Sequence, residues 1–237
     1  AAFPYDLEGV RAMPAPAGLE VWDEVRAVAG AYGLGQIQLL VSSVLGSVCI
    51  PARSHPPTIV MGQNLSQQEP SLERTFLIHR AMKVLQANAA VFARTAPIDL
   101  WPVLAAYLRA FAPTFSPQGV DAARFQEAFG RLSRAVPPNL GHDIGLLAAD
   151  VIGSIGNRAS TLNSAINGWG SRAGLLAVGD SNVALNGIAW AGGNANGPPP
   201  TGKDRLTWIG RNAEARDLVI FSVSDAYVDA RARLGAG

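Results

Sequence analysis

The fold is decided by the stretch Pro57-Thr58-Ile59-Val60-Met61-Gly62, by the polar segment from Asn64 to Pro70, and by the run Ser71-Leu72-Glu73-Arg74-Thr75-Phe76-Leu77-Ile78-His79-Arg80-Ala81-Met82-Lys83. The first part predicts a short apolar strand, and the last part predicts a long helix. From Ser71 to Phe92 the apolar residues are spread more widely around the helix than on a surface helix. We therefore expect a strand, a polar turn and a helix that runs through the core.

The rest of the sequence predicts a small sheet followed by many helices. Three β-rich runs predict a small antiparallel sheet near residues 36–62. Helical spacing then continues almost to the last residue, so we expect an α+β fold that is mostly helical. The expected helices are at about residues 19–31, 71–92, 99–111, 119–135, 139–155, 159–178, 181–190, 201–210 and 213–234, the last one broken near 222–225.

The domain organisation follows from the distribution of proline and glycine. Prolines and a lack of periodicity in residues 1–17 predict an extended N-terminal arm. Residues 18–237 are expected to form one α+β domain with a C-terminal helical extension, because no interior linker is long enough to force a division. Within it, residues 191–200 are the clearest loop.

Composition excludes several classes of protein. Of the 237 residues, 49% are apolar and 16% are charged, so a globular core is expected. The net charge is only +1, which argues against the basic face that binding to nucleic acid requires. The uncharged run Ala27–Ala52 is interrupted by glycine and polar residues, which argues against a membrane span. Cys49 is the only cysteine, so no intrachain disulfide is possible, and a reducing, cytoplasmic location fits best.

The long helix stands where a zinc peptidase would carry H-E-x-x-H. That pattern places two imidazoles on one helical face to hold zinc, while the Glu activates the water bound to it. The best match here is His79-Arg80-Ala81-Met82-Lys83, in which Arg80 replaces the base and Lys83 replaces the second ligand. A second register begins at Arg80 and ends at Val84. Neither register can hold a catalytic zinc, because guanidinium and ammonium groups have no free lone pair.

The order of hairpin, strand, polar turn and helix resembles gluzincin metallopeptidases of the bacterial heat-shock membrane-protease type. Those enzymes take a third ligand from a later helix with a Glu-x-x-x-Asp pattern, and Asn167 and Ser171 stand at these two positions here. The chain also resembles the inactive peptidase-like modules of bacterial tetratricopeptide-repeat proteins, whose helix often has the pattern Phe-Leu-x-x-Arg-Ala. Phe76, Leu77, Arg80 and Ala81 match that pattern. The resemblance covers about residues 18–180 and implies a degenerate former site at His79, Arg80, Lys83, Asn167 and Ser171.

Simpler interpretations of these residues stand beside the resemblance. A lone histidine on an apolar helix is more often a hydrogen-bonded core residue than a metal ligand, so we interpret His79 as structural. Arg80 and Lys83 are interpreted as surface charges, or as side chains that reach solvent from a buried helix. The segment Gly179-Asp180-Ser181-Asn182-Val183 resembles a nucleophile elbow but lacks its closing glycine and a preceding strand, which indicates a turn and a Ser181 N-cap.

Three functions remain open from the sequence. The first is a catalytically inactive, peptidase-like scaffold that binds protein subunits of a bacterial complex, with no catalytic residue, cofactor or metal; Trp169, Trp190 and Trp208, in polar or Gly-rich contexts, favour it. The second is a hydrolase with a non-standard site made from His79 or His142 with Asp143, Asp150 or Asp180. The third is a structural subunit of a larger assembly.

Overall fold

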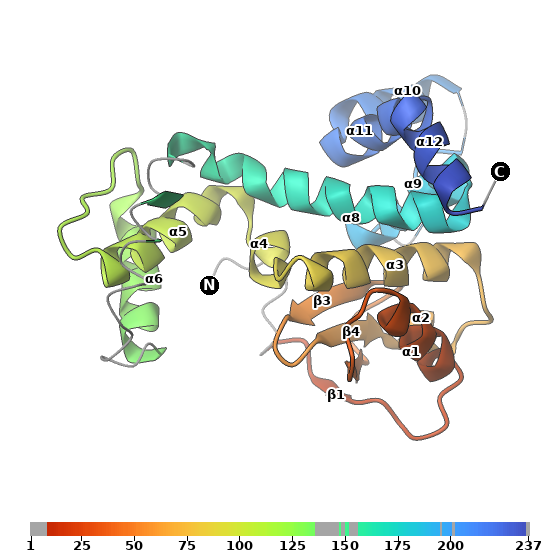
Figure 1. Cartoon of the computed structure of the whole chain (residues 1–237), viewed down its shortest axis with the longest axis horizontal. Helices are drawn as coiled ribbons and strands as arrows, with labels where there is room; N and C mark the ends of the chain where they lie inside the picture. The colour runs from red at the N-terminus through yellow and green to blue at the C-terminus, as the bar shows by residue number, and fades with distance from the viewer. Residues whose placement is uncertain are drawn as a thin grey trace. The chain divides into compact units, whose positions relative to one another are not determined.

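The structure is a computed structural model, and it describes residues 9–135, 147, 150, 151, 156–194, 196–200 and 202–235. The chain divides into two compact units. One, the sheet unit, comprises Tyr5–Ala93 and Ser164–Gly237, and the other, the helical unit, takes in Arg94–Asn163. Each unit is described by itself. The prediction of a mostly helical α+β fold is confirmed (Figure 1).

The sheet unit contains a four-stranded mixed sheet. Its strands are β1 (Ala12–Pro14), β2 (Gln38–Ser42), β3 (Cys49–Arg53) and β4 (Thr58–Gly62), in the spatial order β1-β2-β4-β3. The prediction of an antiparallel sheet near residues 36–62 is right for β3 with β4 but wrong for β2 with β4, which are parallel. The intervening residues carry the chain to the far edge, where β3 forms a hairpin with β4, and this leaves β4 beside β2 in parallel. Strand β1, which pairs antiparallel with β2, was not predicted. It lies within the predicted N-terminal arm.

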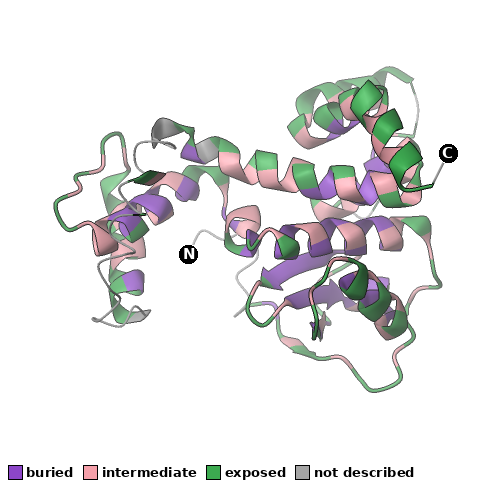
Figure 2. Cartoon of the chain, viewed as in Figure 1, coloured by how far each residue is buried: buried purple, intermediate pink, exposed green. Residues whose placement is uncertain are grey.

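Apolar side chains project from both faces of the sheet. Leu39, Ile59 and Met61 face the main core, whereas Leu40 and Val60 belong to a second, smaller cluster on the opposite face. This alternation is the period of two expected of a pleated strand. Because both faces carry apolar side chains, β4 is buried along its whole length (Figure 2).

Helix α3 (Leu72–Gln86) runs through the core as predicted. Ser71 caps its N-terminus by accepting a hydrogen bond from the backbone N–H of Arg74 at 3.2 Å. Nine of its 15 residues are buried. It ends at Gln86 and not near Phe92, because Asn88 adopts a positive φ of 54° and a short helix, α4 (Ala90–Arg94), follows the turn.

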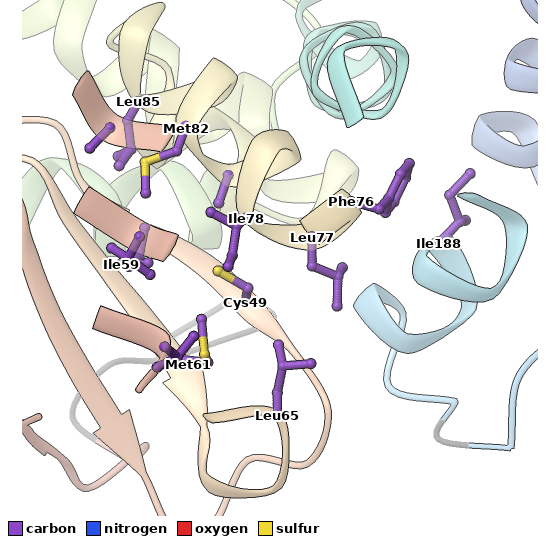
Figure 3. Close-up of a cluster of buried hydrophobic side chains, with 14 of the residues drawn as sticks. Cys49, Ile59, Met61, Leu65, Phe76, Leu77, Ile78, Met82, Leu85 and Ile188 are labelled. Atoms are coloured by element: carbon purple, nitrogen blue, oxygen red, sulfur yellow. The ribbon is translucent and has the colours of Figure 1, made fainter. Parts of the chain in front are cut away.

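Besides α3 and α4, the described part of the sheet unit contains seven more helices. They are α1 (Val21–Ala31), α2 (Gln63–Gln67), α8 (Leu162–Val178, in this unit from Ser164), α9 (Ser181–Ala191), α10 (Gly202–Arg211), α11 (Ala213–Ser222) and α12 (Asp225–Arg233). Buried residues of α1, α8, α9 and α11 join those of α3 in the main core. Figure 3 shows Leu77, Ile78 and Met82 of α3 toward the strands, while Phe76 points toward Ile188 of α9.

Two glycines let α8 and α9 approach Phe76. A Cβ built on Gly174 of α8 would lie 2.6 Å from Phe76 Cδ2, and one built on Gly187 of α9 would lie 2.2 Å from Phe76 Cδ1. A third glycine, Gly170 of α8, lies against Arg80, where a Cβ would come within 2.9 Å of the Arg80 carbonyl oxygen. Only residues without a side chain allow helices this close, so these positions set the distance between α3 and its neighbours.

The helical unit contains α5 (Pro97–Phe111), α6 (Ala122–Ala135) and the 3₁₀ helix η1 (Gly156–Thr161). Leu104, Leu108 and Ala159 form its buried core. Asp99 lies in the first turn of α5, and its carboxylate pairs with the guanidinium of Arg124 on α6. The predicted helix at 139–155 falls almost entirely outside the described residues.

Candidate functional site

Four polar side chains of the sheet unit meet between α3, α8 and α11: Arg80, Asn167, Ser171 and Glu214. Asn167 and Ser171 lie one helical turn apart, so they face the same side of α8. Arg80 comes from α3, and Glu214 from the first turn of α11. We call these four residues the Arg80 cluster. Three of its members are positions where the sequence predicts a degenerate former site.

Arg80 and Ser171 of the cluster are buried, Asn167 and Glu214 are partly buried, and the two charges are paired. The Arg80 side chain is 9% exposed and that of Glu214 is 19% exposed, and their Nε and Oε1 atoms are 3.0 Å apart. The interpretation of Arg80 as a surface or solvent-reaching charge is therefore wrong. A buried guanidinium is stable only when it is paired and hydrogen-bonded, and Glu214 supplies the opposite charge.

The remaining polar atoms bind one another in a defined network. Arg80 Nη2 donates to Asn167 Oδ1 at 2.8 Å, and Arg80 Nε also lies 3.1 Å from Ser171 Oγ. The Ser171 hydroxyl donates to Glu214 Oε1 at 2.5 Å. Asn167 Nδ2 donates to the backbone carbonyl oxygen of Ala93 at 3.2 Å, which fixes the amide with its oxygen toward Arg80.

His79 lies outside this cluster. Consecutive helical residues point about 100° apart, and His79 faces Tyr32 at the C-terminal end of α1. The Tyr32 hydroxyl oxygen and His79 Nδ1 are 3.2 Å apart, and the two rings pack edge to face with centroids 5.6 Å apart. Burial lowers the pKa of His79, against an opposing effect of the Glu24 carboxylate, and burial raises the pKa of Tyr32 to about 12. This hydrogen-bonded packing agrees with the structural interpretation of His79.

Lys83 reaches α8 at a different point. Its ammonium group lies 4.4 Å from the centre of the Trp169 ring, and Nζ donates to Gln86 Oε1 at 2.8 Å. Trp169 is 50% exposed. Lys83 therefore makes a cation–π contact at the surface and takes no part in the Arg80 cluster.

The residues of the alternative His/Asp site are described only in part. His142 and Asp143 lie outside the described residues, and His55 is exposed. Asp180 is the N-cap of α9, where its carboxylate accepts the backbone N–H groups of Asn182 and Val183, so the prediction of a Ser181 N-cap is wrong by one residue. Among the described residues, no group of three or more His, Cys, Asp or Glu side chains could hold a metal ion.

Glu214 is the member of the cluster that sequence reasoning missed. It lies 134 residues from Arg80 along the chain. Its local signal is only that of an acidic residue in the first turn of a helix, which the helix dipole favours in any case. Nothing in the sequence connects it with Arg80, so only the packing of α11 reveals the pair.

The chemistry open to the cluster is limited by burial and by mutual hydrogen bonding. Ser171 and Glu214 form a hydroxyl–carboxylate pair of the kind a nucleophile needs, but Ser171 is fully buried. Arg80 Nε binds the same carboxylate oxygen, Oε1, so that oxygen is already engaged by two partners. Within the described residues, no helix has both the length and the apolar character needed to cross a membrane. Comparison of the chain with protein-family models, curated proteins and solved structures gave no match.

Proposed function

We propose that this chain is a catalytically inactive, peptidase-like scaffold that binds other protein subunits of a bacterial complex. The observation that carries the proposal is the Arg80 cluster. The resemblance to gluzincins implies a metal between the H-E-x-x-H helix and the later ligand helix. The corresponding helices here are α3 and α8, and a paired guanidinium lies between them. A guanidinium held there by hydrogen bonds takes up the space between the two helices and has no lone pair to offer a metal ion, which supports a site without zinc.

The exposed apolar residues of the C-terminal helices support the binding of partners. Large apolar side chains are more than 60% exposed at Leu206, Ile220, Val223, Val228 and Leu234. Apolar side chains that gather in a surface patch mark protein interfaces, and these five all come from residues 206–234. A cytoplasmic location is part of the proposal, since the single cysteine is a free, buried thiol.

The test measures zinc and hydrolysis in the same preparation of purified protein. We expect far less than one zinc per chain by elemental mass spectrometry, and no cleavage of a peptide library with or without a chelator. An Arg80→Ala variant, purified in the same way, controls for a contaminating peptidase, whose activity would be equal in both samples. One zinc per chain together with hydrolysis that a chelator abolishes would refute the proposal.

A further inference from the structure

Glu214 enters the Arg80 cluster from a segment that is otherwise attached by few buried residues. We call α10, α11 and α12 together the C-terminal segment. Neither α10 nor α12 contains a buried residue, and α11 buries only Ala215 and Leu218. The other apolar contacts of the C-terminal segment with the main core come from partly buried side chains: Trp208, Ile209, Val219, Phe221 and Tyr227. In α3, by contrast, nine of 15 residues are buried.

The other three members of the cluster are held in place without Glu214. Arg80 and Asn167 are joined at 2.8 Å, and the backbone carbonyl oxygen of Ala93 fixes the Asn167 amide. Gly170 keeps α8 against the backbone of Arg80. Three donors then converge on the Glu214 carboxylate: Arg80 Nε and the Ser171 hydroxyl at Oε1, and Arg80 Nη2 at Oε2, 3.4 Å away. A guanidinium with a neighbouring hydroxyl is an arrangement suited to a carboxylate.

We infer that Arg80, Asn167 and Ser171 form a carboxylate receptor, that Glu214 is its internal ligand, and that the C-terminal segment detaches as a unit when this carboxylate is lost. Removal of the carboxylate leaves the Arg80 guanidinium buried without an opposite charge, which is strongly unfavourable. The folded chain can relieve that cost by opening where fewest apolar contacts must break. Among the elements that contribute to the Arg80 cluster, the C-terminal segment meets this condition, because α11 has two buried residues, against four in α8 and nine in α3.

The ligand class that the receptor accepts is therefore a carboxylate. In the scaffold proposed above, an acidic side chain of a partner protein would replace Glu214, and this step rests on the proposed function. Because Glu214 is tethered, its effective concentration at the receptor is high, so a partner must bind additional surface in order to displace it. Such a partner would release the C-terminal segment, which carries the exposed apolar residues Ile220, Val223 and Val228.

Hydrogen–deuterium exchange of the whole chain tests the inference. In Glu214→Ala we expect amides of the C-terminal segment to exchange about 100-fold faster than in the wild type, the effect of breaking a buried ion pair. Amides of α3, which exchange by global unfolding, should remain slower than those of the segment in both proteins. The matched control is Asp217→Ala on the same helix, whose exposed carboxylate lies 3.9 Å from its neighbour Arg216. This variant should exchange like the wild type. Formate, the smallest carboxylate, should slow the exchange of Glu214→Ala, and chloride at equal ionic strength should not.

Two results would overturn the inference. If the C-terminal segment and α3 exchange together in both the wild type and Glu214→Ala, the segment is not a separate unit. If formate and chloride act alike, the three residues are not a carboxylate receptor. Should Glu214→Ala fail to fold, Glu214→Gln keeps the side-chain shape and allows the same exchange comparison. In the wild type, the Arg80 Nε–H signal must also be protected from solvent exchange, because this group donates to Glu214. The zinc and hydrolysis measurements are independent of these results, so the two proposals can fail separately.

Discussion

The contact of Phe76 with Gly187 gives a sharp prediction about packing. Phe76 is fully buried, and a Cβ at Gly187 would lie 2.2 Å from its Cδ1 atom and 2.7 Å from its Cε1 atom. On its other edge the ring faces the backbone of α8 at Gly174, where a built Cβ would lie 2.6 Å from Cδ2, so there is little room for it to shift away from α9. Gly187→Ala must therefore displace α9 or force the ring out of its rotamer.

Two opposing effects set the magnitude. Replacing glycine by alanine inside a helix gains up to about 1 kcal/mol from helix propensity. Overpacking a buried site costs about 1–3 kcal/mol, and the clash here, with a ring that is confined on both sides, favours the upper end. We expect Gly187→Ala to lower the free energy of unfolding by about 2 kcal/mol. Gly168→Ala on α8, where a Cβ would meet nothing within 4 Å, should instead be neutral or stabilising.

Urea unfolding followed by circular dichroism measures these differences, and a double-mutant cycle identifies their cause. In a Phe76→Leu background the ring is gone, so Gly187→Ala should cost far less than it does in the wild type. An equal cost in both backgrounds would show that the ring is not responsible. A Gly187→Ala variant as stable as Gly168→Ala would refute the packing argument itself.

Three further predictions concern the polar and titratable groups. Arg80→Met leaves the Glu214 carboxylate largely buried without a cation, and should lower the free energy of unfolding by about 3 kcal/mol in urea titrations; a loss within error of zero would contradict the buried ion pair. Burial lowers the pKa of His79 below 6.5, so the unfolded chain binds a proton at His79 more tightly than the folded chain does. The stability from neutral His79 is then complete above about pH 6.5 and declines as the pH falls toward the folded-state pKa. His79→Gln should therefore flatten the stability profile in that acidic range relative to the wild type, and identical profiles would exclude this linkage. Burial raises the pKa of Cys49 to about 12, so its thiol should resist iodoacetamide at about pH 8 until the chain unfolds, as judged by mass spectrometry; rapid alkylation of the folded protein would contradict this.

The longer helices of the described chain could be predicted well because their signals are local. The short helices were missed: α2 lies where a polar turn was expected, and α4 where α3 was expected to continue. The predicted break near residues 222–225 is where α11 ends and α12 begins, and Ser224 caps the second helix through the N–H of Tyr227. A hydrophobic period and a capping side chain depend only on residues a few positions apart. No local signal in a strand shows which strands lie beside it in the sheet. For this reason the parallel pairing of β2 with β4 was not foreseen.

The site was predictable only in part, for the same physical reason. The spacing of Asn167 and Ser171 places both on one face of a helix, and the resemblance selects Arg80 as a third position. Which side of α3 meets α8 depends on packing. The structure turns Arg80 toward α8 and His79 toward Tyr32.

The sequence by itself determined that α3 crosses the core and that this helix contains no H-E-x-x-H pair of zinc ligands. Both conclusions follow from residue identity and helical period. Only the tertiary structure decided that Arg80 is buried and that Glu214 neutralises it. The free energy of a buried charge depends on the groups that surround it in space, and here the neutralising group is 134 residues away along the chain.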